Sequence, residues 1–96
     1  MMEEAFEIYL NGDPAISSPK AVKSRMSRAR KAEGLLKTSL DVVVGDDDRM
    51  YEALEELQKY ENPKSNPMQN TVRKYYKFKN DRAFPRKKDY RSAKHP

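Results

Sequence analysis

Apolar residues recur along this chain at spacings of three and four, the pattern of helices that bury one side. The periodic segments predict four helices, over residues 3–10, 19–37, 47–60 and 66–80. The side chains expected in the core share one face of their helix: Phe6, Tyr9, Leu10, Val22, Met26, Ala29, Leu36, Met50, Leu54, Leu57, Met68, Val72, Tyr75 and Tyr76. The pattern therefore predicts an all-α fold.

Capping residues support the starts of three of these helices. Ser18 precedes Pro19, and a serine N-cap followed by proline at the first helical position is a frequent helix start. Asn66 and Pro67 repeat this arrangement before the last predicted helix. The acids of residues 46–48 suit the start of the third helix, because carboxylates cap free amides and favour the positive end of the helix dipole.

Two segments lie outside the predicted helices. The valines of residues 40–45 favour an extended conformation, but a lone strand would lack a partner. We therefore expect a buried connector, with Leu40 and Val43 in the core. Residues 81–96 are basic and hold few apolar groups, which predicts a mobile basic tail after a helical domain of residues 1–80.

Composition narrows the class of protein. Ninety-six residues with 36% hydrophobic content allow one small domain with a thin core. The chain has no cysteine, which excludes disulfides and thiolate zinc sites. No apolar run approaches the ~20 residues of a membrane span, and the acidic first residues differ from a signal peptide. We expect a cytoplasmic protein without membrane association.

Charge is distributed in blocks along the chain. Residues 17–39 carry seven basic residues and one acidic residue, and residues 63–96 carry eleven basic residues and two acidic ones. Residues 40–62, between them, carry eight acidic and two basic residues. Two basic blocks in one small domain favour a positive face that binds nucleic acid, although an ordinary charged surface is the simpler alternative.

Several short motifs occur in a recognisable order. Phe-x-x-Tyr-Leu starts at Phe6, Ser-Pro-x-x-Val-x-Ser at Ser18, Ala-Leu-x-x-Leu at Ala53, and Asn-Thr-Val-Arg-Lys-Tyr-Tyr-Lys-Phe at Asn70. Together they resemble the N-terminal SAM-like core-binding domain of phage integrases and other tyrosine recombinases, over about residues 5–79. That resemblance implies an orthogonal four-helix bundle that clamps double-stranded DNA, in proteins of DNA recombination and mobile genetic elements.

The resemblance and the charge pattern both indicate candidate DNA contacts. On the second helix they are Ser18, Lys20, Lys23, Ser24, Ser27, Arg30 and Lys31. On the fourth helix they are Asn70, Thr71, Arg73, Lys74 and Lys77, and in the tail Arg86, Lys87 and Lys88. Two helix starts with hydroxyl or amide side chains and nearby cations would form a phosphate-binding surface.

The same residues argue against catalysis. The arginine–histidine–arginine–tyrosine set of tyrosine recombinases is missing, and His95 is the only histidine. Tyr90 lacks activating arginines, and the acids of residues 46–48 suit helix capping better than a metal ion. We expect no enzyme activity, cofactor or metal. The chain is then a stand-alone protein, or the first domain of a larger one whose catalytic domain is absent here.

Two functions remain open at this point. The first is a non-catalytic module that binds double-stranded DNA. The alternative is an adaptor that binds a basic protein partner through the acidic side of the third helix, formed by Asp48, Glu52, Glu55 and Glu56. Tyr75, Tyr76 and Phe78 could stack on bases, but their spacing favours core packing for at least one ring.

Overall fold

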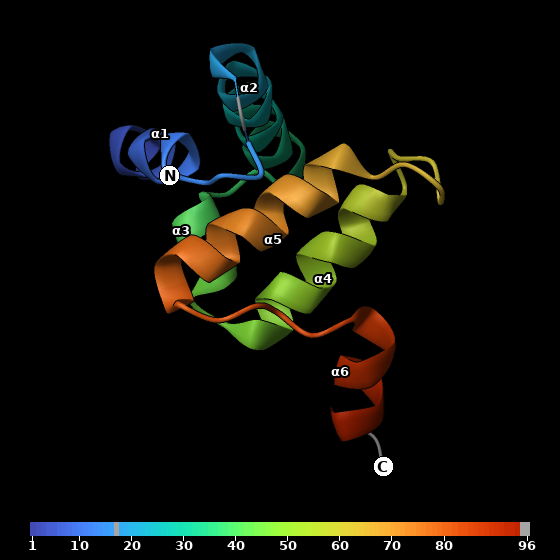
Figure 1. The fold of residues 1–96 in the computed structure, drawn as a ribbon. Coiled ribbons are helices and arrows are strands. Elements are labelled where there is room, and N and C mark those ends of the chain that lie inside the picture. Colours follow the sequence, from blue (N-terminus) through green and yellow to red (C-terminus); the bar gives the residue numbers. More distant parts are fainter. Residues whose placement is uncertain (17, 95–96) are drawn as a thin grey trace.

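The computed structural model describes residues 1–16 and 18–94, which form six helices and no strand (Figure 1). The helices are α1 Glu3–Asn11, α2 Pro19–Leu36, α3 Leu40–Val44, α4 Asp47–Gln58, α5 Pro67–Asn80 and α6 Lys87–Lys94. The all-α prediction is confirmed, and α1, α2, α4 and α5 match the four expected helices. The additional helices α3 and α6 lie in the two segments that were expected to be a connector and a mobile tail.

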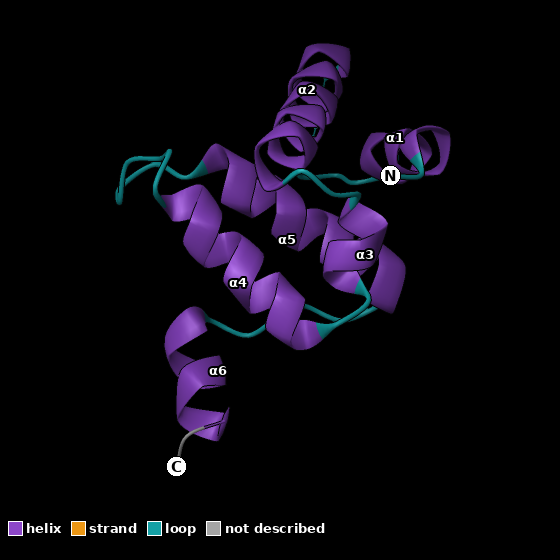
Figure 2. Cartoon of the chain, turned by 180° about the vertical axis from the view of Figure 1, so that it is seen from behind, coloured by secondary structure: helices purple, strands orange, loops and turns teal. Residues whose placement is uncertain are grey.

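Helix α5 is the element around which the domain is assembled. It contacts α1, α2, α3 and α4 (Figure 2). Its buried side consists of Met68, Val72, Tyr75 and Tyr76, as the periodicity predicts, together with Gln69 and Thr71. The other predicted stripes also face inward, apart from Tyr9 and Leu36, which are only partly buried.

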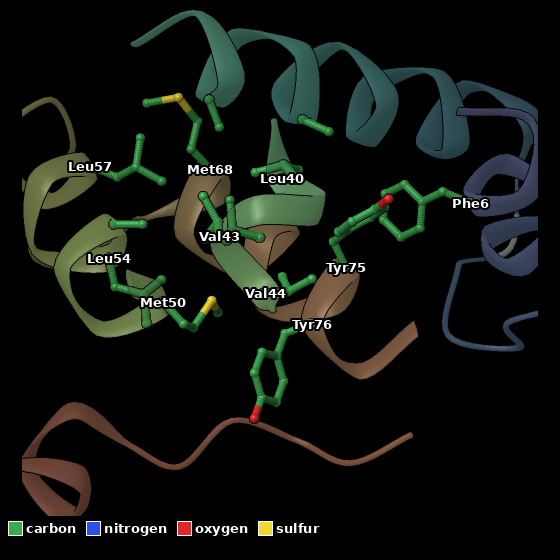
Figure 3. Close-up of a cluster of buried hydrophobic side chains, with 14 of the residues drawn as sticks. Phe6, Leu40, Val43, Val44, Met50, Leu54, Leu57, Met68, Tyr75 and Tyr76 are labelled. Carbon is green, nitrogen blue, oxygen red and sulfur yellow. The ribbon is translucent and has the colours of Figure 1, made fainter. Parts of the chain in front are cut away.

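The short helix α3 lies in the middle of the core (Figure 3). Leu40, Val43 and Val44 are all buried, so the expectation that this connector fills the core is confirmed. The connector is helical, although its valines by themselves favour an extended conformation. The hydroxyl of Ser39 accepts a hydrogen bond from the amide of Asp41 at 3.0 Å, and this cap together with burial outweighs a weak strand propensity.

The predicted caps hold at two helices and fail at the third. Ser18 Oγ accepts from the Ala21 amide at 3.1 Å, and Asp46 caps α4 through the amides of Asp48 and Arg49. The side chain of Asn66 caps nothing. The carboxylate of Glu61 instead accepts from the amides of Met68 and Gln69 at 2.6 and 3.1 Å, because the loop before α5 brings this stronger acceptor to the helix start.

The C-terminal segment is docked, where a mobile tail was expected from residue 81. Phe84 is buried and meets the ring of Tyr76 edge-on, with 5.1 Å between centroids. Arg73 donates to the carbonyl oxygens of Phe84 and Pro85, both at 3.1 Å. Phe84 and Tyr90 attach this segment to the domain. The low hydrophobic content of the segment gave no sign of these contacts. His95 and Pro96 lie outside the described residues.

A glycine inside α2 provides a test of the helix assignment. Nothing lies within 4 Å of the position that a Cβ would take at Gly34, so Gly34→Ala should raise the free energy of unfolding by about 0.5–1 kcal/mol. Urea denaturation measures this change. At Gly45 the added Cβ would lie 3.2 Å from the Asp41 carbonyl oxygen, so Gly45→Ala should gain less or lose stability. A lower free energy of unfolding for Gly34→Ala would contradict the open space that the structure shows around this position.

Candidate nucleic-acid interface

One side of α2 forms a continuous basic surface. A shallow, solvent-open hollow on it is lined by Lys20, Lys23, Ser24, Ser27, Arg28 and Lys31, and we call this set the basic face. Its three lysines are exposed, and within the described residues none of its four cations forms an ion pair with a carboxylate. Five of its six members were predicted from the sequence, and Arg28 is the addition.

Arg30, also predicted as a DNA contact, is engaged with α1. Its Nε and Nη2 both lie 2.7 Å from Oε1 of Glu3. Both side chains are more than half exposed, so this ion pair adds at most about 1 kcal/mol of stability. Arg30 therefore links α2 to α1 by a weak surface ion pair and does not belong to the basic face.

Three predicted contacts on α5 are not available at the surface. Thr71 is fully buried. Arg73 is half-buried and holds the C-terminal segment, and burial lowers the pKa of its guanidinium from the ordinary value. Lys74 forms an ion pair with Asp13 and lies 5.9 Å from the centre of the Tyr9 ring. Hydrogen bonds from Lys74 and from the Ala15 amide lower the pKa of Asp13.

The start of α5 does not match the predicted phosphate site. The amides of Met68 and Gln69, which would bind an anion there, are occupied by the carboxylate of Glu61. Asn70 and Lys77 are exposed on α5, but Lys77 faces a different groove, beside Asp13 and α1. The structure therefore does not reproduce the paired helix starts that the resemblance implies.

The tail cations are separated from the basic face. Helix α6 and helix α2 lie at opposite ends of the molecule in both views (Figures 1 and 2). Arg86 pairs with Asp89 at 2.9 Å, and Lys87 lies 3.8 Å from Glu55 and contacts Gln58. Of the three predicted tail residues, Lys88 is exposed and has no ion pair in the described part of the chain.

The acids at the start of α4 bind protein groups. Asp46 caps the helix, Asp47 accepts from the Tyr76 hydroxyl at 2.7 Å, and Asp48 accepts from the Tyr90 hydroxyl. The described residues contain no group of three acidic or histidine side chains arranged to hold a metal ion. No helix in the same residues is long and apolar enough to pass through a bilayer.

A second carboxylate with a perturbed pKa is Asp41, on α3. It accepts from the hydroxyl of Tyr75, which in turn accepts from the Met2 amide at 2.9 Å. Burial alone would raise the pKa of Asp41, but hydrogen bonds from Tyr75 and the Met1 amino group lower it below its usual range. This cluster ties α3, α5 and the N-terminal segment together and has a structural role.

Comparisons with protein-family models, with curated proteins and with solved structures find no match. The resemblance to recombinase core-binding domains therefore stays a prediction from sequence motifs.

Thr71 offers a direct test of which residues face a ligand. Its hydroxyl is buried without a hydrogen-bond partner in the described structure, which is costly, so Thr71→Val should raise the free energy of unfolding by about 1 kcal/mol. If the chain binds duplex DNA as the sequence predicts, its affinity should stay unchanged, because the Thr71 side chain does not reach the surface. Denaturation and a binding titration measure the two effects. A loss of affinity with unchanged stability would show that Thr71 contacts the duplex after all.

The Asp41 cluster predicts a pH dependence of stability. A carboxyl whose pKa is lowered on folding stabilises the protein above its unfolded pKa of about 3.9 and loses that effect as pH falls through the folded value. Asp41→Asn should therefore destabilise at neutral pH, and its difference from wild type should shrink below about pH 4. Urea unfolding across pH measures both. A difference that stays constant with pH would show that Asp41 acts through packing alone.

Proposed function

We propose that this chain binds double-stranded DNA without catalysis, through the basic face of α2. The observation that carries the proposal is the row of Lys20, Lys23 and Lys31, exposed on one rigid helix and without carboxylate partners in the described structure. Lysine, arginine and serine side chains are common donors to phosphate oxygens. Such contacts hold a duplex in place with little dependence on sequence.

The dimensions of the row suit a phosphate backbone. Lys20 and Lys31 are eleven residues apart on one helix, which corresponds to about 16 Å of rise. Consecutive phosphates of one strand are further apart than their axial rise of about 3.4 Å, because the strand winds around the axis, so the row reaches only a few of them. The opposite side of α2 buries Val22, Met26 and Ala29, which keeps the cations aimed outward.

The proposal is narrower than the expectation from sequence. It relies on α2 and leaves out Thr71, Arg73 and Lys74, whose side chains are engaged within the protein. The resemblance to recombinase core-binding domains supports the same ligand. A role in recombination would require a catalytic domain from elsewhere. The adaptor alternative is less favoured, because α6 already contacts Asp48 and Glu55 on the acidic side of α4.

Removing three charges from the basic face tests the proposal. Lys20→Gln, Lys23→Gln and Lys31→Gln together should lower duplex affinity by about 10- to 100-fold at ~0.1 M salt. The slope of log affinity against log salt should fall in magnitude by about 2.7, since each lost phosphate contact contributes about 0.9. Fluorescence anisotropy with a labelled duplex at several salt concentrations measures both quantities.

A matched variant separates the basic face from net charge. Arg49, Lys59 and Lys64 are exposed and lie outside both the basic face and α6, so replacing them with glutamine removes the same charge elsewhere. This control should retain most of the affinity. Equal losses in the two variants would show a general charge effect and defeat the proposal. Absence of duplex binding by the wild type would favour the adaptor alternative.

A further inference from the structure

Helix α6 is attached to α4 by side chains near the surface. Arg91 and Lys87 lie 3.9 and 3.8 Å from Oε1 of Glu55, and Arg91 also donates to the Tyr51 hydroxyl at 3.0 Å. The ring of Tyr90 stacks on Tyr51 with 5.5 Å between centroids. The Tyr90 hydroxyl donates to Asp48. Cations and one aromatic ring on α6 thus meet carboxylates and one aromatic ring on α4.

This attachment is weak compared with the anchor that precedes it. Arg91 is 64% exposed and Glu55 is 42% exposed, and ion pairs in such positions contribute little and weaken with salt. No side chain of residues 87–92 is buried, whereas Phe84 is. Helix α6 can therefore leave α4 while Phe84 and Arg73 keep the preceding segment in place.

Glu55 occupies the α6 cations Lys87 and Arg91, and Asp48 occupies the Tyr90 hydroxyl, in the way that phosphate oxygens would. Arginine and lysine form charge-assisted hydrogen bonds with either anion, so a duplex can compete with Asp48 and Glu55 for the same groups. Arg86 and Lys88 are exposed next to these groups and add positive charge to the same short segment. Release of α6 would free Lys87 and Arg91 together.

We propose that α6 is a second DNA-binding element, held against α4 by Asp48 and Glu55 and released when a duplex supplies phosphates in their place. The inference rests on the proposed function, because the duplex is the ligand in both. It gives Lys87 and Arg91, which face Glu55 while α6 lies against α4, a contact with the duplex once α6 is released. It also gives Asp48 and Glu55 a regulatory role, since they lower affinity until α6 is displaced.

Two single substitutions on α4 provide the first test. Glu55→Gln removes the partner of Lys87 and Arg91, whereas Glu52→Gln removes the same charge one turn earlier, at an exposed position without an ion pair in the described structure. Glu55→Gln should raise duplex affinity about three- to tenfold and steepen the salt slope by up to about 1.8, for two added phosphate contacts. Glu52→Gln should leave both close to wild type. Equal effects of the two substitutions would overturn the inference.

A charge-neutral substitution provides the second test. Tyr90→Ala removes the stack on Tyr51, the ring contact with Phe84 and the bond to Asp48 without changing net charge, and it should raise affinity as Glu55→Gln does. Adding Lys87→Gln and Arg91→Gln to this variant should abolish the gain. A gain that persists without these two cations would show that α6 does not contact the duplex.

Amide hydrogen exchange follows the release of α6 directly in the wild-type chain. Exchange at the amides of residues 90–92 should change on addition of duplex, while the amides of α5 stay protected. Unchanged exchange in α6 with measurable duplex binding overturns this inference and leaves the proposed function standing. No duplex binding by the wild type at low salt overturns both.

Discussion

Two adjacent tyrosines on α5 connect that helix to almost every other part of the fold. Tyr75 meets the ring of Phe6 on α1 edge-on at 4.9 Å and donates its hydroxyl to Asp41 on α3. Tyr76 donates to Asp47 on α4 and packs against Phe84 in the C-terminal segment. Both rings are fully buried. Burial, reinforced by the carboxylate partner, raises the pKa of Tyr76 to about 12, so its hydroxyl remains a donor across the physiological range.

This arrangement determines which surfaces remain for a ligand. Because α5 is enclosed by its neighbours, the polar side chains on it are drawn into internal contacts, as with Arg73 and Lys74. Helix α2 packs only one side against the domain and leaves the other open. Positive charge therefore stays available on α2, where no segment in the described structure covers it. The division of roles between the two helices follows from packing, since both are rich in cations.

Local signals predicted much of this fold. The periodicity of apolar residues located α1, α2, α4 and α5, and the caps at Ser18 and Asp46 involve neighbours within three residues. Helix α3 has five residues, too few for periodicity to show, and its stability depends on burial. Helix α6 was missed because contacts with the distant α4 hold it. Hydrophobic content along the sequence does not record such contacts.

The candidate site was predicted in part for the same reason. Position on a helix face indicated the basic side of α2, and that inference needed no knowledge of other segments. The partners of Arg30, Lys74 and the start of α5 come from Glu3, Asp13 and Glu61, each brought in by the tertiary fold. A motif that matches a DNA-contacting helix shows which side chains are present. It does not show which of them are already occupied.

The rigidity of the basic face has a consequence for the rate of association. Its cations are carried by one continuous helix whose other side is buried, so their relative positions are set before a partner arrives. A partner then needs only to meet this charged surface in the right orientation. Long-range electrostatic attraction raises the rate of that encounter. On the proposed function, ionic strength would act mainly on the association rate at this face, whereas the weakly held α6 would govern how long a bound duplex stays.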